Sequence, residues 1–387
     1  MKELIILGVT GSIGKQVLET IKGKDFKVRS IACGKRVELV EDIISEYNIE
    51  YLSISDQSEE TLEKVKKLQE KFPLLKVGFG EEGLIKAVIG YPGDVVNAIT
   101  GIAGLVPTVK AIECKKNVML ANKETLVVAG NIILEMAKTN NVRIVPIDSE
   151  HNALYRLMKN VKSQEISKLI ITASGGAFRE KSREELENVT IDDALAHPNW
   201  SMGAKITVDC ATMVNKGLEV MEAHHLFGFD YDKIETVIHP ESIIHSMVEY
   251  NDNSVGALMY NPSMLIPIQY AIYENNVDCA IDCTSVKKIN FSELKQISFR
   301  TMDVVRFPMI KLAYDVGKKG GLLPTVFNAS NEAAVSLFLN GKIKFLQIEE
   351  IIRSACLKYQ DINEKKPNYT IEDILNLDKE VKANILM

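Results

Sequence analysis

The chain has 387 residues, of which 46% are hydrophobic and 25% are charged, and its formal net charge is −6. This composition is typical of a soluble globular protein of two or three domains, and the charge gives no electrostatic reason to expect a nucleic-acid partner. No apolar run approaches the roughly 20 residues that span a bilayer, so we expect no membrane association. The six cysteines form no C-x-x-C pair, which favours a cytoplasmic protein and argues against a zinc site.

Short strands and helices alternate through the first 150 residues. The first apolar run, residues 4–7, follows a single basic residue and ends at Gly8, which is typical of a strand and not of a signal peptide. This alternation predicts an α/β domain with a parallel sheet covered by helices on both faces, as in a Rossmann-like fold. Further strands are expected at residues 28–32, 51–54, 95–99, 117–120 and 142–147, with helices at residues 15–21 and 37–47.

The pattern changes near residue 168, where a second, α+β domain is expected. Two long loops rich in Gly, Pro and Asn lie near Gly175 and Pro198, and the residues after 299 have the apolar spacing of a small helical bundle. Strands are expected at residues 169–172, 236–238, 244–250 and 255–260. The expected domains are residues 1–148, 149–280 and 299–387, with a connection at residues 281–298.

The first expected strand runs into a glycine-rich turn, G-V-T-G-S-I-G, at residues 8–14. The glycine spacing is related to the dinucleotide-binding fingerprint, in which the backbone approaches a pyrophosphate and the following helix offers free N–H groups. A glycine-rich turn without a ligand is the alternative. NAD-specific proteins usually have an acidic residue at the end of the second strand, whereas this chain has Lys35 and Arg36. Two cations there favour the 2′-phosphate of NADP over a solvated basic turn.

Two carboxylates and an imidazole, Asp148, Glu150 and His151, follow the apolar run at residues 142–147. Ligands bind at the carboxyl ends of parallel strands, and like charges two residues apart repel unless a cation lies between them. Hard oxygen ligands without a nearby cysteine favour Mg²⁺ or Mn²⁺. These residues therefore predict a divalent metal site, unless their side chains point into water.

A third carboxylate, Glu219, lies in the block N-K-G-L-E, where it would share one helical face with Asn215 and Lys216. This face is either a binding surface or a solvated one. Another polar block, L-A-N-K-E, closes an earlier strand and places Lys123 at the carboxyl edge of the sheet. There Lys123 would meet a polar substrate or form a salt bridge at the surface.

Two loops of the second domain add polar groups. Ser174 stands before two glycines at the end of a strand, which suits anion contact through its hydroxyl and through backbone N–H groups. The loop H-P-N-W-S-M-G at residues 197–203 contains the only tryptophan, Trp200. A tryptophan in a loop is either a core anchor or part of a lid over a site.

These blocks, in their order along the chain, resemble the 1-deoxy-D-xylulose 5-phosphate reductoisomerase family: G-x-T-G-S-I-G, L-A-N-K-E, D-S-E-H-N-A, S-G-G-x-F, H-P-N-W-S-M-G and N-K-G-L-E. A further block, I-H-P-x-S-I-I-H-S-M-V, lies at residues 238–248. The resemblance implies a homodimer of chains with an NADPH-binding domain, a catalytic domain with a flexible lid, and a C-terminal helical domain. It also implies the NADPH- and divalent-metal-dependent rearrangement and reduction of 1-deoxy-D-xylulose 5-phosphate to 2-C-methyl-D-erythritol 4-phosphate, in the non-mevalonate route to isoprenoid precursors.

The resemblance also implies roles for individual residues. NADPH would be bound by Thr10, Gly11, Ser12 and Ile13 at its pyrophosphate, by Gly34, Lys35 and Arg36 at its 2′-phosphate, and elsewhere by Asn122, Glu124 and Gly203. Asp148, Glu150 and Glu219 would hold the metal and, with Lys123, form the catalytic residues. The phosphosugar substrate would contact Lys123, Ser149, Glu150 and Glu219 near its reacting carbons, and Ser174, His197, Cys210, Asn215 and Lys216 at its phosphate, with Trp200 in the lid and His245 in support.

The sequence departs from the family pattern at one position of interest. The family usually has serine in V-D-S-A-T, whereas this chain has Cys210 in V-D-C-A-T. A thiol is a weaker hydrogen-bond donor than a hydroxyl, so we expect Cys210→Ser to keep or lower the substrate KM. A second departure, Val9 in place of a common serine, should be harmless because the backbone does the binding there.

Two other functions fit parts of the sequence. An NADP-linked dehydrogenase of a phosphorylated polyol would need the glycine turn and a lysine, but not three carboxylates or a strict dependence on metal. An NADP-sensing protein on a decayed enzyme scaffold would bind the cofactor without turnover, and the intact residues Lys123, Asp148, Glu150 and Glu219 argue against it. The residues leave open which divalent ion is used, and whether the carbon skeleton moves by retro-aldol cleavage, which family grounds favour, or by a direct shift.

Overall fold

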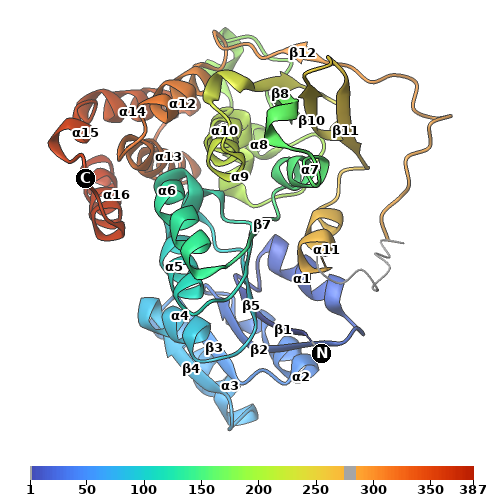
Figure 1. Cartoon of the computed structure of the whole chain (residues 1–387). Helices are drawn as coiled ribbons and strands as arrows, with labels where there is room; N and C mark the ends of the chain where they lie inside the picture. Colours follow the sequence, from blue (N-terminus) through green and yellow to red (C-terminus); the bar gives the residue numbers. More distant parts are fainter. Residues whose placement is uncertain (1, 274–284) are drawn as a thin grey trace. The chain divides into compact units, whose positions relative to one another are not determined.

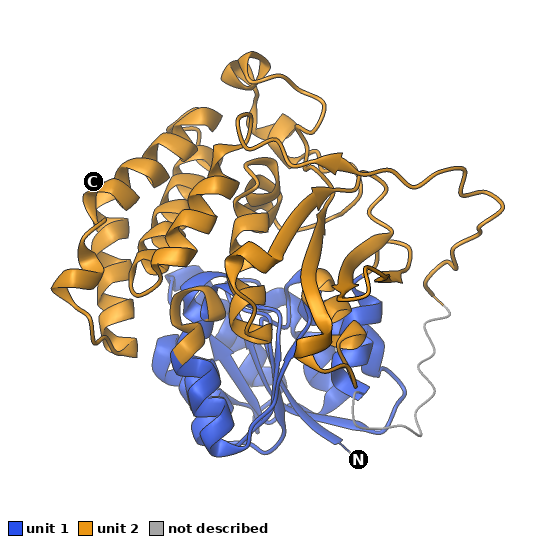
Figure 2. Ribbon diagram, turned by 45° about the horizontal axis from the view of Figure 1, so that its top comes forward, with its two compact units in different colours: residues 1–125, 132–148, 264–283 blue, residues 126–131, 149–263, 284–387 orange. Residues whose placement is uncertain are grey.

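The computed structural model describes residues 2–273 and 285–387 (Figure 1). The chain divides into two compact units (Figure 2). Unit 1 comprises Met1–Thr125, Ile132–Asp148 and Met264–Cys283, and unit 2 comprises Leu126–Asn131, Ser149–Ser263 and Thr284–Met387. Within the described ranges, no helix combines the length and the apolar composition that crossing a membrane would require.

Unit 1 is built on a seven-stranded sheet in which every neighbouring pair is parallel. Strands are added outward from β1 to β4 on one side, and from β5 to β7 on the other, so the order reverses beside β1. In open α/β sheets, ligands bind outside the carboxyl ends of the strands at such a reversal. Across the sheet the strands are β4 (Lys76–Phe79), β3 (Tyr51–Ile54), β2 (Phe26–Cys33), β1 (Lys2–Leu7), β5 (Asp94–Asn97), β6 (Val118–Leu120) and β7 (Ile144–Pro146).

The central strand β1 shows why this sequence forms a covered parallel sheet. Its four consecutive apolar residues, Leu4 to Leu7, are all 0% exposed. A strand covered on both faces needs a continuous apolar run and not an alternating one. The helices of unit 1 are α1 (Ser12–Ile21), α2 (Glu41–Tyr47), α3 (Glu59–Lys71), α4 (Gly80–Ile89), α5 (Leu105–Glu113), α6 (Lys123–Asn140, interrupted at Ala129, with residues 126–131 in unit 2) and α11 (Leu265–Tyr273), with 3₁₀ turns η1 (Val37–Leu39) and η2 (Gly101–Gly104).

Unit 2 contains a five-stranded mixed sheet and most of the C-terminal helices. β8 pairs in parallel with β9, whereas β10 is antiparallel to both β8 and β11, and β12 is antiparallel to β9. Across the sheet the strands are β11 (Val255–Met259), β10 (Ile244–Tyr250), β8 (Ile166–Ala173), β9 (Ile234–Ile238) and β12 (Arg300–Thr301).

The helices of unit 2 fall into two groups. The first group follows the sheet and its loops: α7 (Ser149–Leu157), α8 (Ile191–Leu195), α9 (Ala204–Ala211) and α10 (Val214–Phe227), with 3₁₀ turns η3 (Ser163–Glu165), η4 (Glu184–Asn188) and η5 (Tyr231–Lys233). The second group is α12 (Pro308–Lys319), α13 (Leu323–Leu339), α14 (Phe345–Lys358), α15 (Ile362–Lys365) and α16 (Ile371–Leu386). The long helix α13 is buried along most of its length and packs against α14 and α16.

The predicted fold class is confirmed: an α/β Rossmann-like region comes first, and the chain ends in helices. Strands β1, β2, β8 and β9 begin two or three residues earlier than predicted, and β4 and β12 were not predicted. β4 contains a glycine and β12 has only two residues, so neither has the apolar run that marks a strand. The predicted domain bounds stay a prediction. The connection predicted at residues 281–298 begins in residues 274–284, which lie outside the described residues.

Candidate active site

The glycine turn follows β1 at the place where the strand order reverses. Gly8 has a φ of +83°, and a Cβ on it would lie 2.5 Å from the Ala98 carbonyl oxygen. A Cβ on Gly14 would lie 2.4 Å from the Gly8 oxygen. Gly11 is the residue before α1, so this helix begins without a side-chain cap on its first N–H groups. The turn therefore depends on glycine for its shape, and the first N–H groups of α1 stand where a pyrophosphate would bind.

The predicted 2′-phosphate residues lie at the carboxyl end of β2, the neighbour of β1. β2 ends at Cys33, and the three residues that follow, Gly34, Lys35 and Arg36, are all exposed. Thr10 is buried inside the glycine turn, whereas Ser12 is exposed at the start of α1 and Ile13 is partly exposed. Unit 1 therefore presents a glycine turn and two accessible cations at the carboxyl ends of adjacent strands.

Asn122 organises the next strand end of unit 1. Its side-chain oxygen accepts a hydrogen bond from the Thr125 N–H at 3.1 Å, which caps helix α6. Its Nδ2 donates to the backbone oxygens of Ile99 and Gly101, both at 2.7 Å, and to Glu124 Oε2 at 3.1 Å. Asn122 thus joins the end of β6 to the loop after β5. The predicted cofactor residues Asn122 and Glu124 are held by the same network.

Lys123 and Asp148, which follow the neighbouring strands β6 and β7, form an ion pair. Lys123 is the first residue of α6 and is 5% exposed, and its Nζ lies 2.6 Å from Asp148 Oδ2. Asp148 comes two residues after the end of β7. The predicted catalytic lysine and the first predicted metal ligand are therefore in direct contact within unit 1.

Unit 2 places a lysine between two further carboxylates. Lys216 Nζ donates to Glu150 Oε1 at 2.8 Å and also to Glu219 Oε2. Asn215 Nδ2 donates to Glu219 Oε1 at 2.6 Å. Burial lowers the pKa of Lys216, but the charges of Glu150 and Glu219 raise it more, so the net shift is upward. Lys216 is therefore a fixed cation beside the two carboxylates. Ser149 precedes Glu150, and its hydroxyl donates to Glu150 Oε2.

Asp148 is followed directly by the first residue of α7. Its carboxylate forms a group with the carboxylates of Glu150 and Glu219. One oxygen from each of the three carboxylates lies within 4.8 Å of the others. Three negative charges at this spacing need positive charge nearby, which the ammonium groups of Lys123 and Lys216 supply in part. Because all the donors are oxygen, the group fits Mg²⁺ or Mn²⁺.

A second polar group of unit 2 forms where β8 ends. His197 Nδ1 accepts hydrogen bonds from the backbone N–H groups of Asn199 and Trp200, at 3.1 and 3.0 Å. The hydrogen of the neutral ring must then lie on Nε2, which donates to Ser174 Oγ at 2.9 Å. Ser174 Oγ also accepts from the Gly176 N–H at 3.2 Å. The Ser174 hydroxyl hydrogen can therefore donate to an anion.

The His197 ring is neutral at neutral pH. Burial, and secondarily the charge of Arg179, lower the pKa of His197 to about 4. Arg179 Nη1 donates to the backbone oxygens of Ser174 at 3.3 Å and Pro240 at 3.1 Å. This arginine thereby fixes the loop that carries Ser174. Sequence reasoning missed Arg179, although an arginine four residues after Gly175 in a glycine loop was a visible signal.

Trp200 stands beside an aromatic pair in unit 2. Its ring centroid lies 6.1 Å from that of His245, at an interplanar angle of 72°. His245 in turn stacks on Tyr260, with centroids 3.7 Å apart. Burial lowers the pKa of His245 to about 4, against the opposing charge of Glu150. The Trp200 side chain is partly exposed. Its ring therefore lies between solvent and the stacked rings of His245 and Tyr260.

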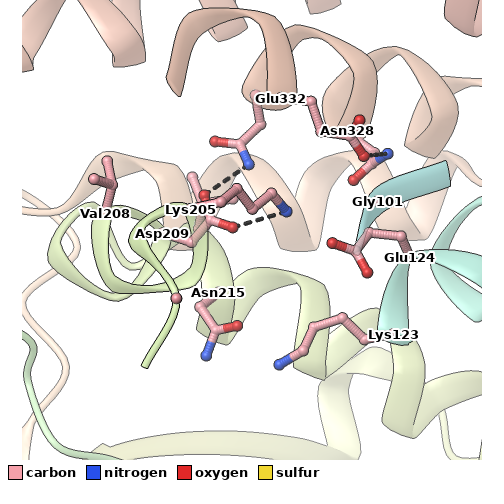
Figure 3. Close-up of polar contacts among 12 residues, drawn as sticks. Gly101, Lys123, Glu124, Lys205, Val208, Asp209, Asn215, Asn328 and Glu332 are labelled. Carbon is pink, nitrogen blue, oxygen red and sulfur yellow. Dashed lines mark hydrogen bonds and ion pairs between the residues drawn. The ribbon is translucent and has the colours of Figure 1, made fainter. Parts of the chain in front are cut away.

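Helix α9 carries the predicted residues Gly203 and Cys210 near its two ends. Gly203 precedes the helix, with open space around the position of a Cβ. A Cβ on Gly176 would lie 2.4 Å from the Cys210 backbone oxygen, so the Ser174 loop lies against the end of α9. Lys205 and Asp209 pair on α9 at 2.9 Å, as drawn in Figure 3. Ser174, His197 and Cys210 are therefore close together, whereas Asn215 and Lys216 contact the carboxylates.

A glycine turn at the strand reversal, exposed cations after β2 and a group of three carboxylates are together typical of dinucleotide-dependent enzymes that use a divalent metal ion. Family models match most of the chain. The 1-deoxy-D-xylulose 5-phosphate reductoisomerase model matches residues 4–130, its C-terminal domain model matches residues 144–227, and a further DXP reductoisomerase C-terminal domain model matches residues 259–384. The chain belongs to the 1-deoxy-D-xylulose 5-phosphate reductoisomerase family, as its sequence blocks predicted.

Similar proteins cover the whole chain. The 1-deoxy-D-xylulose 5-phosphate reductoisomerase of Bacillus subtilis (strain 168) is 46% identical over 389 residues, which cover 100% of this chain and 99% of the relative. The enzyme of Geobacillus sp. (strain WCH70) has the same identity and coverage. A crystal structure of DOX-P reductoisomerase with NADPH, fosmidomycin and magnesium has a TM-score of 0.92 at 34% identity, covering 100% of this chain and 97% of that one. The Zymomonas mobilis enzyme with NADPH has a TM-score of 0.86 at 34% identity, covering 99% and 97%.

Proposed function

We propose that this protein converts 1-deoxy-D-xylulose 5-phosphate to 2-C-methyl-D-erythritol 4-phosphate, with NADPH and a divalent metal ion. The observation that carries the proposal is the group of three carboxylates, Asp148, Glu150 and Glu219, with ligand oxygens within 4.8 Å of one another. A simple dehydrogenase would not need this group. The relatives with full-length coverage carry the reductoisomerase name, and similar crystal structures contain NADPH and magnesium.

The glycine turn and the end of β2 are the parts of the chain that would hold NADPH. The pyrophosphate would lie on residues 10–13, where α1 begins without a side-chain cap. The 2′-phosphate would lie on Lys35 and Arg36, both exposed, with Gly34 allowing close approach. Asn122, Glu124 and Gly203 would contact other parts of the cofactor. NADH lacks the 2′-phosphate, so it would lose the contacts to both cations.

Asp148, Glu150 and Glu219 would hold the divalent ion. When bound, the ion would supply positive charge that polarises the substrate carbonyl, and NADPH would supply the hydride. Lys123 contacts Asp148 at 2.6 Å, so its ammonium orients that carboxylate and stabilises negative charge that develops on a substrate oxygen. Lys216 restrains Glu150 and Glu219 in the same way. Ser149 would contact the substrate's oxygen-bearing carbons.

The loops of unit 2 would bind the phosphate end of the substrate. Ser174 Oγ is held by His197 and Gly176 so that its hydroxyl hydrogen can donate to an anion. Cys210 lies next to Gly176 of the Ser174 loop. Asn215 and Lys216 would complete the phosphate contacts. Trp200, whose backbone N–H donates to His197 Nδ1, would close over the substrate as part of a lid. Binding of the remote phosphate would then orient the reacting carbons.

Several features complete the proposal. The reaction would belong to the non-mevalonate route to isoprenoid precursors, with the carbon skeleton moving by retro-aldol cleavage. The protein would act in the cytoplasm as a homodimer, which light scattering after size-exclusion chromatography would test. Residues 1–148 would form the cofactor domain, 149–280 the catalytic domain, 281–298 a connection and 299–387 the helical domain.

NADPH oxidation tests the proposed function. Purified protein is mixed with 1-deoxy-D-xylulose 5-phosphate and NADPH, with Mg²⁺, Mn²⁺ or EDTA, and NADH replaces NADPH in the control. We expect oxidation that requires both the substrate and the divalent ion and that strongly prefers NADPH. A protein that binds NADPH but oxidises none under any of these conditions would contradict the proposal.

A further inference from the structure

We propose that Arg179 is a positioning residue that supplies the positive charge balancing the substrate's phosphate at the Ser174 loop, residues 174–176. The inference rests on the proposed function and deepens it, because it names the cation that serves the phosphate end of the substrate. Arg179 does not belong to the predicted site. It lies five residues after Ser174, in the turn that follows β8.

The side chains predicted to bind the phosphate bring little net positive charge. The serine, cysteine and asparagine among them are uncharged at neutral pH, and His197 is neutral because burial, above all, lowers its pKa to about 4. The remaining member, Lys216, already bonds to the two carboxylates of Glu150 and Glu219. A phosphate ester carries a charge of about −1.5 to −2 at pH 7. The phosphate therefore needs a further cation close to the Ser174 loop.

Arg179 packs directly against the backbone of this loop. Gly175 has a φ of +88°, and a Cβ on it would lie 2.6 Å from the Arg179 Cβ and 3.3 Å from the Arg179 Cδ. The glycine therefore leaves room for the arginine side chain to cross the loop. Arg179 Nη1 then donates to the backbone oxygen of Ser174 at 3.3 Å. The guanidinium charge thus lies beside the residue whose hydroxyl can donate to the anion.

Contacts with two other segments of unit 2 hold the guanidinium in this position. Arg179 Nη1 also lies 3.1 Å from the Pro240 backbone oxygen and 3.4 Å from Asn199 Oδ1. Asn199 Nδ2 donates to the same Pro240 oxygen at 2.8 Å. Asn199 belongs to the predicted lid loop at residues 197–203, and Pro240 follows β9. Arg179 therefore joins the Ser174 loop, the lid loop and the end of β9, and its guanidinium stays charged at any ordinary pH.

The charge of Arg179 acts at the place where the anion would bind. After burial, this charge is the second cause of the low pKa of His197, because it disfavours a positive charge on the ring. The ring nitrogen Nε2 of His197 bonds to Ser174 Oγ at 2.9 Å. A potential that disfavours a cation on this ring favours an anion beside it. The same guanidinium therefore keeps His197 neutral and attracts the phosphate.

Neighbouring carboxylates neutralise Arg179 only in part. Its Nε lies 3.5 Å from Glu180 Oε1, but the Glu180 side chain is 64% exposed and also bonds to Arg300 at 2.9 Å. A third arginine, Arg306, donates from Nη1 to the Arg179 backbone oxygen at 3.0 Å and pairs with the exposed Asp303 at 3.5 Å. These three guanidinium groups share two exposed carboxylates, and water screens exposed ion pairs strongly. Positive charge therefore remains for an anion.

A purely structural role is the competing explanation, because Arg179 also braces the loop through its hydrogen bonds. Two substitutions separate charge from hydrogen bonding. Arg179→Lys keeps the positive charge and loses the planar fork of donors, whereas Arg179→Gln keeps a donor and loses the charge. If the charge matters, the lysine variant binds phosphate better than the glutamine variant, and the difference shrinks as salt screens the charge. A brace would show no such dependence on salt.

The test measures NADPH oxidation by the full-length protein with Mg²⁺ and 1-deoxy-D-xylulose 5-phosphate, at low and at high KCl. Inhibition by inorganic phosphate is measured with the same proteins, so that the phosphate end is probed alone. The third variant is Glu180→Gln, which removes an exposed negative charge beside Arg179. Arg183→Gln is the matched control, because Arg183 is the next arginine along the chain and pairs with the buried carboxylate of Glu349 at 2.9 Å. Thermal unfolding shows which variants are folded.

At low KCl, we expect Arg179→Gln to raise both the substrate KM and the Ki of inorganic phosphate about tenfold, with a smaller change in kcat. Arg179→Lys should stay within about threefold of the wild type, and Glu180→Gln should lower both constants about twofold. High KCl should bring all these values closer together. Arg183→Gln should lower the melting temperature and leave both constants unchanged.

The inference is overturned if Arg179→Lys is as impaired as Arg179→Gln, or if the defect of Arg179→Gln is the same at low and high KCl. If neither Arg179 variant folds, Glu180→Gln decides, because an unchanged or raised Ki of inorganic phosphate in that variant also overturns the inference. A folded wild type that oxidises no NADPH with this substrate and Mg²⁺ would instead contradict the proposed function itself.

Discussion

Replacing Lys216 by methionine should destabilise the metal-free protein by about 3 kcal/mol. Lys216 is 4% exposed and its ammonium bonds to Glu150 and Glu219. Breaking a buried ion pair costs about 3–5 kcal/mol because the remaining charge is left without compensation. The lower end applies here, because the Glu150 side chain is 17% exposed and water screens part of its charge.

The loss should be visible as a fall in melting temperature that depends on Mg²⁺. A stability change of 1 kcal/mol shifts the melting temperature of a unit of this size by about 2–4 °C, so we expect a fall of about 6–12 °C in EDTA. A divalent ion bound by the same carboxylates would replace the lost positive charge. Saturating Mg²⁺ should therefore raise the melting temperature of Lys216→Met more than that of the wild type.

Lys382→Met is the matched control for this experiment. Lys382 also lies between two carboxylates of unit 2, Glu332 at 2.6 Å and Asp378 at 2.9 Å, and it is not part of the predicted site. Its replacement should lower the melting temperature equally with and without Mg²⁺. Thermal unfolding followed by circular dichroism measures both variants. The reasoning is refuted if Lys216→Met matches the wild type in EDTA, or if Mg²⁺ has no larger effect on it than on Lys382→Met.

Three further predictions concern the cofactor turn, the phosphate loop and acid stability. In Gly14→Ala, the new Cβ would lie 2.4 Å from the Gly8 oxygen, so the turn must shift. The affinity for NADPH, measured by fluorescence titration, should fall tenfold or more, which corresponds to about 1.4 kcal/mol. Unchanged affinity would show that the turn adapts. Cys210→Ser should keep or lower the substrate KM, and a strong rise would rule out a hydroxyl-like phosphate contact at this position. Burial lowers the pKa of His225 to about 4, whereas the unfolded side chain titrates near 6.5. The unfolded state therefore binds a proton first, and about 3 kcal/mol of stability, fully present above pH 6.5, is lost as the pH falls towards 4. Between pH 6.5 and pH 4, the melting temperature should therefore fall less steeply in His225→Asn than in the wild type. Equal slopes would show that His225 does not cause this loss of stability.

Features set by neighbouring residues could be predicted from the sequence. The apolar run of residues 4–7 and the glycines at 8, 11 and 14 define a strand followed by a phosphate-type turn, because each acts through local backbone geometry. Asp148 and Glu150 were recognisable because they follow a strand end directly. β4 escaped prediction because its sequence K-V-G-F has only two large apolar residues.

Features that depend on distant contacts could not be predicted. Helical spacing places Lys216 beside Glu219, but Lys216 is 66 residues from Glu150, and nothing in the sequence shows that its ammonium would also bond to that carboxylate. The same holds for His151 and the backbone of Glu219, which are 68 residues apart. Helical spacing shows that Glu219 and Glu222 share a face, but it does not show that this face meets α7. Family resemblance supplied the ligands, and only the folded arrangement supplied the residues behind them.

The most direct test of the proposed reaction is to follow the hydride with NADPH deuterated at the transferable position. The products formed from 1-deoxy-D-xylulose 5-phosphate and Mg²⁺ would be identified by nuclear magnetic resonance and mass spectrometry. Rearrangement before reduction predicts 2-C-methyl-D-erythritol 4-phosphate with one deuterium on the new primary alcohol carbon. Deuterium on the original carbonyl carbon of an unbranched polyol phosphate would mean simple carbonyl reduction and would contradict the proposed reductoisomerase activity.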